Sequence, residues 1–171
     1  MARLSVCSTP DAVCSSRLMV VAVFAAGIVC NAEAAERMTA VRDPESGQIE
    51  ISEAGQPVLR YNYFTVRLPE GFLNRVAKRV RKYAKARSDY IHPLYGPDGE
   101  ILTRDFSPDH PHHRGIYWAW PQVEFRGELG DLHALQRVFA RPTGNIRLRS
   151  GRDWAQIEAE NLWKWEDRIP I

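Results

Sequence analysis

The chain has 171 residues, of which 44% are hydrophobic and 26% are charged. This composition is that of a globular domain, and it excludes a disordered chain and a collagen-like repeat. The 23 Lys and Arg residues against 21 Asp and Glu give a net charge of +2. Such a balance excludes a protein whose overall charge attracts polyanions strongly, and it is too weak to predict a partner.

The N-terminal segment has the pattern of an export signal. Arg3 and Arg17 precede an apolar run at Leu18–Val29, which is shorter than the about 20 residues of a membrane span. The small residues Ala32 and Ala34 then supply a cleavage site. We therefore predict a signal peptide at residues 1–35 and an exported protein, periplasmic or extracellular, without membrane contact after cleavage.

All three cysteines lie in this predicted signal peptide, at Cys7, Cys14 and Cys30. Residues 36–171 contain none, so the mature protein is expected to have neither disulfide bonds nor thiol chemistry. It also has no second apolar run of membrane length.

The first half of the mature chain alternates between strand signals and a basic stretch. Ile49 and Ile51 alternate with polar residues, and residues 58–68 are rich in aromatic and branched side chains, as in β-strands. Residues 72–88 contain seven Lys or Arg and no acidic residue, and their apolar positions predict a short amphipathic helix. We interpret its basic residues as a solvated face rather than as a nucleic-acid or anionic-surface patch, because the rest of the chain is not basic.

Strand signals return at Tyr90. Residues 90–95 and 100–103 flank the turn sequence Gly96–Gly99, which predicts a hairpin. A proline-rich polar loop follows, and Ile116–Trp120 is so aromatic that a strand or a binding wall is expected.

The C-terminal part ends in a second predicted hairpin. Residues 132–139 are compatible with one or two helical turns, whereas residues 146–149 alternate and lead through the turn 150–153 into Trp154–Trp165. Short strands separated by Gly, Pro and Asp turns predict an all-β protein, an antiparallel β-sandwich.

Four of the five histidines cluster in the sequence, at His92, His110, His112 and His113. One interpretation is a metal site, because His110 and His112 would point the same way on an extended segment and could share an ion with His92 or Asp109. Without a second Cys/His pair this signal is weak, and no metal ligand or cofactor is assigned.

A second interpretation is a polar pocket for a sugar-like small molecule. Histidines exchange protons near neutral pH, Arg114 can hold hydroxyls or a carboxylate, and aromatic faces pack on the C–H faces of sugars. In a third interpretation the histidines tie down a loop and Trp118 and Trp120 belong to the core. The cluster as a whole favours the pocket. The predicted catalytic residues are His92, His110, His112, His113 and Asp109, and the predicted substrate-binding residues are Arg114, Tyr117, Trp118 and Trp120.

Four motifs follow one another in this region: Ser88–Tyr95, Asp98–Thr103, Asp109–Gly115 and Trp118–Trp120. In this order they resemble the secreted PmoA-like family, a domain of unknown function that has been labelled "methane oxygenase PmoA". The resemblance runs from about Val58 to the C-terminus, although His133 stands where an aromatic such as Trp is expected. It implies a β-sandwich related to the galactose-mutarotase supersandwich and linked with bacterial carbohydrate metabolism, in which one histidine is the general acid and a carboxylate the base.

The resemblance also implies that family members continue beyond the segment Asn161–Ile171, so residues 36–171 are expected to be the N-terminal part of an incomplete sandwich. Methane oxidation is not expected, because its membrane subunit needs several long apolar helices. The sequence therefore predicts an exported β-sandwich that binds or processes a carbohydrate. A metal-binding, oxygenase-like protein and a non-catalytic fragment are the alternatives, and no nucleic-acid partner is expected. Enzymatic activity and oligomeric state stay open.

Overall fold

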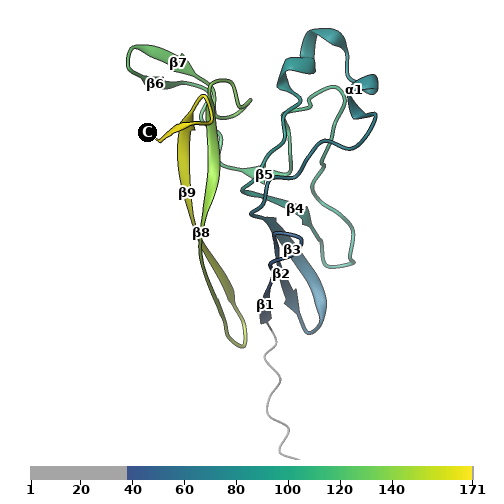
Figure 1. Cartoon of the computed structure of the whole chain (residues 1–171). Coiled ribbons are helices and arrows are strands. Elements are labelled where there is room, and N and C mark those ends of the chain that lie inside the picture. Colours follow the sequence, from purple (N-terminus) through teal and green to yellow (C-terminus); the bar gives the residue numbers. More distant parts are fainter. Residues whose placement is uncertain (1–37, 171) are drawn as a thin grey trace, which may run out of the picture. The chain divides into compact units, whose positions relative to one another are not determined.

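The computed structural model describes residues 38–170, so the predicted signal peptide and its three cysteines lie outside the described residues. The described part contains ten β-strands in three antiparallel sheets and two short helices (Figure 1). The predicted all-β, sandwich-like fold is confirmed. None of the helices in this part is long and apolar enough to cross a membrane.

The largest sheet has five strands in the order β1-β2-β3-β4-β5. Its strands are β1 (Met38–Asp43), β2 (Gln48–Glu53), β3 (Gln56–Asn62), β4 (Tyr90–Leu94) and β5 (Ile116–Tyr117). Ile49 and Ile51 are both buried, which confirms the predicted alternation in β2. β5 is shorter than predicted, because the aromatic run leaves the sheet after Tyr117.

The C-terminal hairpin is also confirmed. β8 (Val138–Ser150) pairs with β9 (Ala155–Trp165), and β10 (Ile169–Pro170) adds a short third strand. The register shifts between Pro142 and Ile146, where proline lacks the N–H that a regular ladder requires. A small separate hairpin joins β6 (Val123–Phe125) to β7 (Glu128–Gly130).

The basic stretch folds differently from the single helix that we predicted. It forms α1 (Phe72–Arg75) and the 3-10 helix η1 (Lys78–Tyr83), with Val76 and Ala77 extended between them. Phe72, Val76 and Ala84 are buried together, with Leu68, Val80 and Phe106 packed against them. Because Val76 is buried although its backbone is extended, the apolar residues of this stretch reach the core without a continuous helix.

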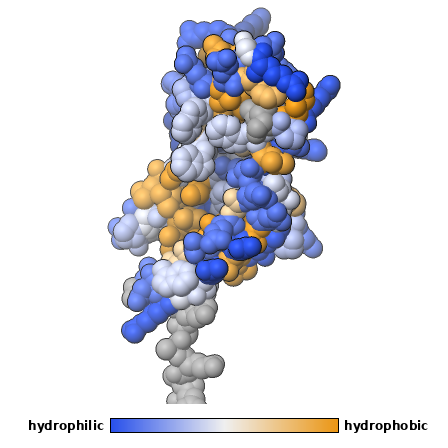
Figure 2. All heavy atoms as spheres, turned by 90° about the vertical axis from the view of Figure 1, so that its left-hand side faces the viewer, coloured by the Kyte–Doolittle hydropathy of each residue, from blue (hydrophilic) through white to orange (hydrophobic). Residues whose placement is uncertain are grey.

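A second buried cluster lies under the C-terminal hairpin. Leu132, Leu135, Val138 and Trp165 form it, and residues 132–135 are turns rather than the predicted helical turns. On the face drawn in Figure 2, hydrophobic residues stay exposed between polar ones. The five-stranded sheet and β9 also line a shared cavity of about 570 Å³.

Candidate functional site

The loop before β5 presents the central histidines because the residues between them are buried. Pro111 and the side chain of Arg114 are fully buried, whereas His110 and His113 are exposed. The backbone N–H of His113 donates to the carbonyl of His110 at 2.9 Å, which closes a turn. Pro111 and Arg114 thus anchor the loop, and the histidines are their direct neighbours in the sequence.

A second segment brings the fifth histidine to the same place. The backbones of Asp131 and Gln136 exchange two hydrogen bonds of 2.7 Å, and the Asp131 carboxylate accepts from the N–H of Ala134 at 2.9 Å. Leu132 and Leu135 are buried in the core below this turn. His133 is therefore half-buried on a turn that is closed by hydrogen bonds and packed on the core.

Three imidazoles converge where these segments meet. The ring of His112 lies 4.4 Å from that of His113 and 4.9 Å from that of His133, measured between centroids. Nitrogen atoms of the three rings all lie within 4.8 Å of one another. The Nδ1 atom of His112 is buried and has no hydrogen-bond partner among the described residues. We call His112, His113 and His133 the histidine triad.

His110 lies at the edge of the histidine triad. Its ring stacks on His113 at 5.0 Å, but it is 6.2 Å from the ring of His112. The expected sharing of one ion by His110 and His112 assumed an extended segment. The turn at this point brings His113 and His133 close to His112 instead.

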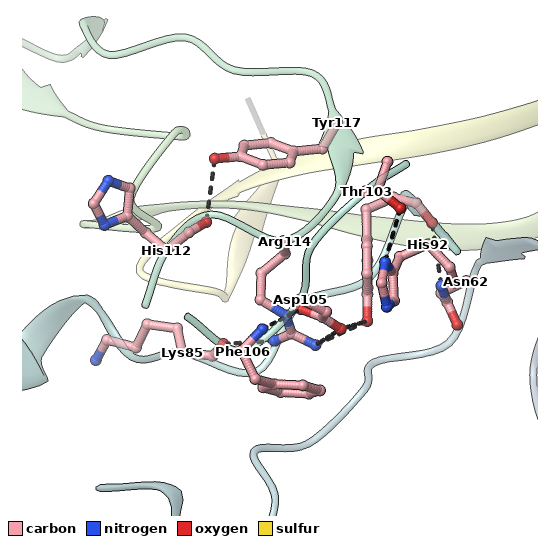
Figure 3. A network of polar contacts seen from close by, with 10 residues as sticks. Asn62, Lys85, His92, Thr103, Asp105, Phe106, His112, Arg114 and Tyr117 are labelled. Carbon is pink, nitrogen blue, oxygen red and sulfur yellow. Dashed lines mark hydrogen bonds and ion pairs between the residues drawn. The ribbon is translucent and has the colours of Figure 1, made fainter. Parts of the chain in front are cut away.

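Tyr117 and Arg87 join the two segments that carry the triad. The Tyr117 hydroxyl donates to the His112 carbonyl at 3.1 Å (Figure 3). The Tyr117 ring stacks on His133, with 5.8 Å between the ring centroids. The Arg87 guanidinium lies 3.9 Å from the centre of the Tyr117 ring. It donates to the Leu132 carbonyl at 3.3 Å and also to the His133 carbonyl.

The environment of His112 and His113 favours their neutral imidazoles. Burial, followed by the neighbouring His113, His133 and His110, lowers the pKa of His112 to about 4, against the opposing charge of Asp131. Burial, followed by His110 and His133, also lowers the pKa of His113. A neutral imidazole keeps the lone pair with which histidine binds metals.

Two of the predicted site residues belong to another network, seen in Figure 3. Arg114 forms a buried ion pair with Asp105 and donates to the Tyr90 hydroxyl at 2.8 Å. On β4, the Nδ1 atom of His92 lies 2.9 Å from the Thr103 hydroxyl, and burial lowers the pKa of His92. Neither residue contributes a ligand atom to the histidine triad.

The other predicted residues are dispersed. Asp109 is exposed beside His110. Trp118 is 78% exposed and lines the cavity between the sheets, and Trp120 is half exposed and contacts Trp163 at 6.3 Å between ring centroids. Of the nine predicted residues, the structure gathers His110, His112, His113 and Tyr117 at the triad.

His133 completes the triad, although it was not among the predicted site residues. Its contact with His112 joins residues 21 positions apart, which no local pattern predicts. The available signal was a fifth histidine close to Asp131, in a chain whose other four histidines lie together.

The low pKa of His112 leads to a prediction about how the stability of the metal-free protein depends on pH. The pKa is about 4 in the folded protein and 6.5 in the unfolded chain. Between these two pH values His112 binds a proton in the unfolded chain but not in the folded protein. We expect the free energy of unfolding to decrease as the pH falls from 6.5 towards 4. Urea unfolding measured across this range should show a weaker pH dependence in His112→Gln; an unchanged dependence would contradict the assignment to His112.

Comparison with known proteins identifies a family for the chain. No curated protein and no solved structure matches it, and nothing confirms the resemblance to the PmoA-like family. The model of one family matches residues 48–168, which include β2 to β9, the triad and Arg87. The chain belongs to DUF6807, a family of unknown function.

Proposed function

We propose that this protein binds a divalent transition metal, zinc or copper, through His112, His113 and His133. The observation that carries the proposal is the convergence of three imidazoles from two separately anchored segments, with nitrogen atoms within 4.8 Å of one another. Three protein ligands with a fourth position left to water or substrate are typical of catalytic zinc sites.

The distances are compatible with small adjustments on binding. Ligand atoms about 2.1 Å from a tetrahedral zinc lie about 3.4 Å from one another, so shifts of about 1 Å in the rings would complete the site. The buried Nδ1 atom of His112 is a further support. A buried polar atom without a partner costs about 1–3 kcal/mol, and a metal ion bound there would remove that cost.

The surrounding residues suggest what a bound ion would do. Three neutral ligands leave the positive charge of the ion undiminished, which favours activation of a bound water or polarisation of a carbonyl. His110 is exposed and stacks on His113 at the edge of the triad, where a bound small molecule could reach it. We therefore favour metal-assisted chemistry on a small molecule.

Carbohydrate binding, which the sequence led us to expect, is the second candidate. Trp118 offers an exposed flat face, and it lines the cavity between the sheets together with Tyr61 and Asp89, which offer polar atoms. It stands second because Arg114 and His92, two of its expected polar residues, are engaged with Asp105 and Thr103. Export of the protein likewise stays a prediction.

Calorimetric titration of untagged, chelator-treated protein with Zn²⁺ and Cu²⁺ tests the metal site. We expect one ion per chain, and His133→Ala should lower the affinity by about 100-fold or more because it removes one of three ligands. His92→Ala is the matched control, since its ring lies against Thr103 instead of in the triad. Less than about a tenth of an ion per chain, or equal binding by His133→Ala, would exclude the proposed site.

A further inference from the structure

The basic stretch between β3 and β4 contains seven of the 23 Lys and Arg residues of the chain and no acidic residue. Six of its cations are exposed: Arg75, Lys78, Arg79, Arg81, Lys82 and Lys85. In the rest of the chain acidic residues outnumber basic ones. No carboxylate of the described residues forms an ion pair with any of the six. We call these six residues the basic surface.

The basic surface is held in place by the apolar cluster beneath it. Phe72, Val76 and Ala84 are buried, which fixes α1, η1 and the extended linker on the body of the fold (teal in Figure 1). The cations lie between these buried residues or directly after the last of them, and all six are exposed to solvent. Like charges held close together repel one another, and an anionic partner would relieve this repulsion.

Several of the cations are also ordered by local contacts. The Arg81 Nε donates to the Val76 carbonyl at 3.0 Å, the Arg75 guanidinium lies 5.4 Å from the centre of the Phe72 ring, and the Lys82 ammonium lies 4.9 Å from that of Tyr83. Side chains that are ordered before binding lose less entropy when a ligand pairs with them.

We propose that the basic surface docks an anionic polysaccharide, one that carries sulfate or carboxylate groups. Arginine forks and lysine ammonium groups pair with such anions without base-specific contacts. A nucleic acid fits less well. Phe72 is buried and Tyr83 packs against His112, so the segment presents no exposed aromatic ring for stacking bases, and helices of four and six residues cannot read a major groove.

Binding of heparin, of polygalacturonate and of a duplex DNA to metal-free protein, each measured over a series of salt concentrations, tests the proposal. The chelated protein is used so that ions at the histidine triad make no contribution. We expect heparin or polygalacturonate to bind with an affinity that falls steeply with salt, and the stronger of the two identifies sulfate or carboxylate as the preferred group. Neutral dextran should not bind.

The decisive variant combines Lys78→Glu, Arg79→Glu and Lys85→Glu, whose side chains make no hydrogen bond to another described residue. It should lower the glycan affinity by at least about tenfold and flatten the salt dependence. Arg147→Glu, Arg149→Glu and Arg152→Glu together are the matched control, because they change the net charge equally on exposed positions of β8 and its turn.

Two results would overturn the proposal. Equal losses in the two triple variants would show that binding depends on overall charge rather than on the basic surface. Tighter binding of the duplex DNA than of either glycan at the same ionic strength would assign the surface to nucleic acid.

Discussion

Arg114→Met should lower the free energy of unfolding by about 3–5 kcal/mol, because it leaves a carboxylate buried without its counter-charge. The side chains of Arg114 and Asp105 are 0% and 6% exposed. Asp105 also accepts a hydrogen bond of 3.0 Å from the Tyr90 hydroxyl, which itself accepts one from Arg114. Losing the arginine therefore leaves both Asp105 and the Tyr90 hydroxyl without their buried partner, and thermal or urea unfolding measures the result.

Two further variants separate the buried charge from the loss of packing. Adding Asp105→Leu to Arg114→Met removes the unpaired carboxylate, so the double variant should be more stable than the single one. Arg137→Met is the surface control, because Arg137 pairs with Glu128 and Glu166 at exposed positions and should leave the unfolding midpoint almost unchanged. Equal losses in Arg114→Met and Arg137→Met would contradict the structural role of the buried pair.

This pair has a consequence for the histidine triad. Arg114 directly follows His113, and Gly115 after it adopts φ +70°, with its Cα so close to the Ile91 carbonyl that a Cβ would lie 2.1 Å from that oxygen. The loop is thus fixed on its C-terminal side by a buried ion pair and by close contact with β4. A rigid support of this kind is what a metal site with three ligands requires.

The strands could be predicted because their signals are local. The alternation at Ile49 and Ile51 and the alternation before Ser150 depend on neighbouring residues, and each indicates the observed strand. The turn at Gly96–Gly99 is present, but residues 100–103 form a single bridge, between Ile101 and Tyr95, instead of the predicted second strand. The prediction of a single helix at residues 72–88 was wrong, because Val76 is buried through its packing in the cluster with Phe72 and Ala84 rather than through helical periodicity.

The site could be predicted only in part, for a related reason. The density of histidines indicated the right loop, but the direction of each ring depends on which neighbours are buried. Arg114 has the chemistry of a substrate-binding residue, yet Asp105 and Tyr90 surround it completely. His133 reaches His112 only because a separate turn packs on the core through Leu132 and Leu135.

The same reasoning assigns a positioning role to Arg87, which is 4% exposed. Its guanidinium donates to the carbonyls of Leu132 and His133 and stacks on Tyr117, whose hydroxyl holds the His112 carbonyl. Burial lowers the pKa of Arg87 to about 10, which leaves it charged at neutral pH. It thereby connects the segment of His133 to the segment of His112.

Arg87→Lys should lower the affinity for the metal by about 10–100-fold, the usual effect of removing a group that orients a ligand. Lysine keeps the charge but lacks the planar guanidinium, which stacks on the Tyr117 ring while its Nη2 donates to both carbonyls. The visible absorption of the Co²⁺-loaded protein should also change, because it reports the arrangement of the ligands, which a general loss of stability would not alter.

Arg141→Lys is the matched control, because the Arg141 guanidinium donates to Asp167 through Nε and Nη2, at 2.7 and 2.8 Å, away from the two carbonyls of the His133 turn. Its Zn²⁺ affinity and its Co²⁺ spectrum should equal those of the parent protein. If Arg87→Lys also bound metal with the parent's affinity and spectrum, the orientation of His133 would have to come from its own closed turn, through Asp131, Gln136 and the buried leucines. A selective loss in Arg87→Lys would instead show that the triad depends on a contact between two segments that each fold locally.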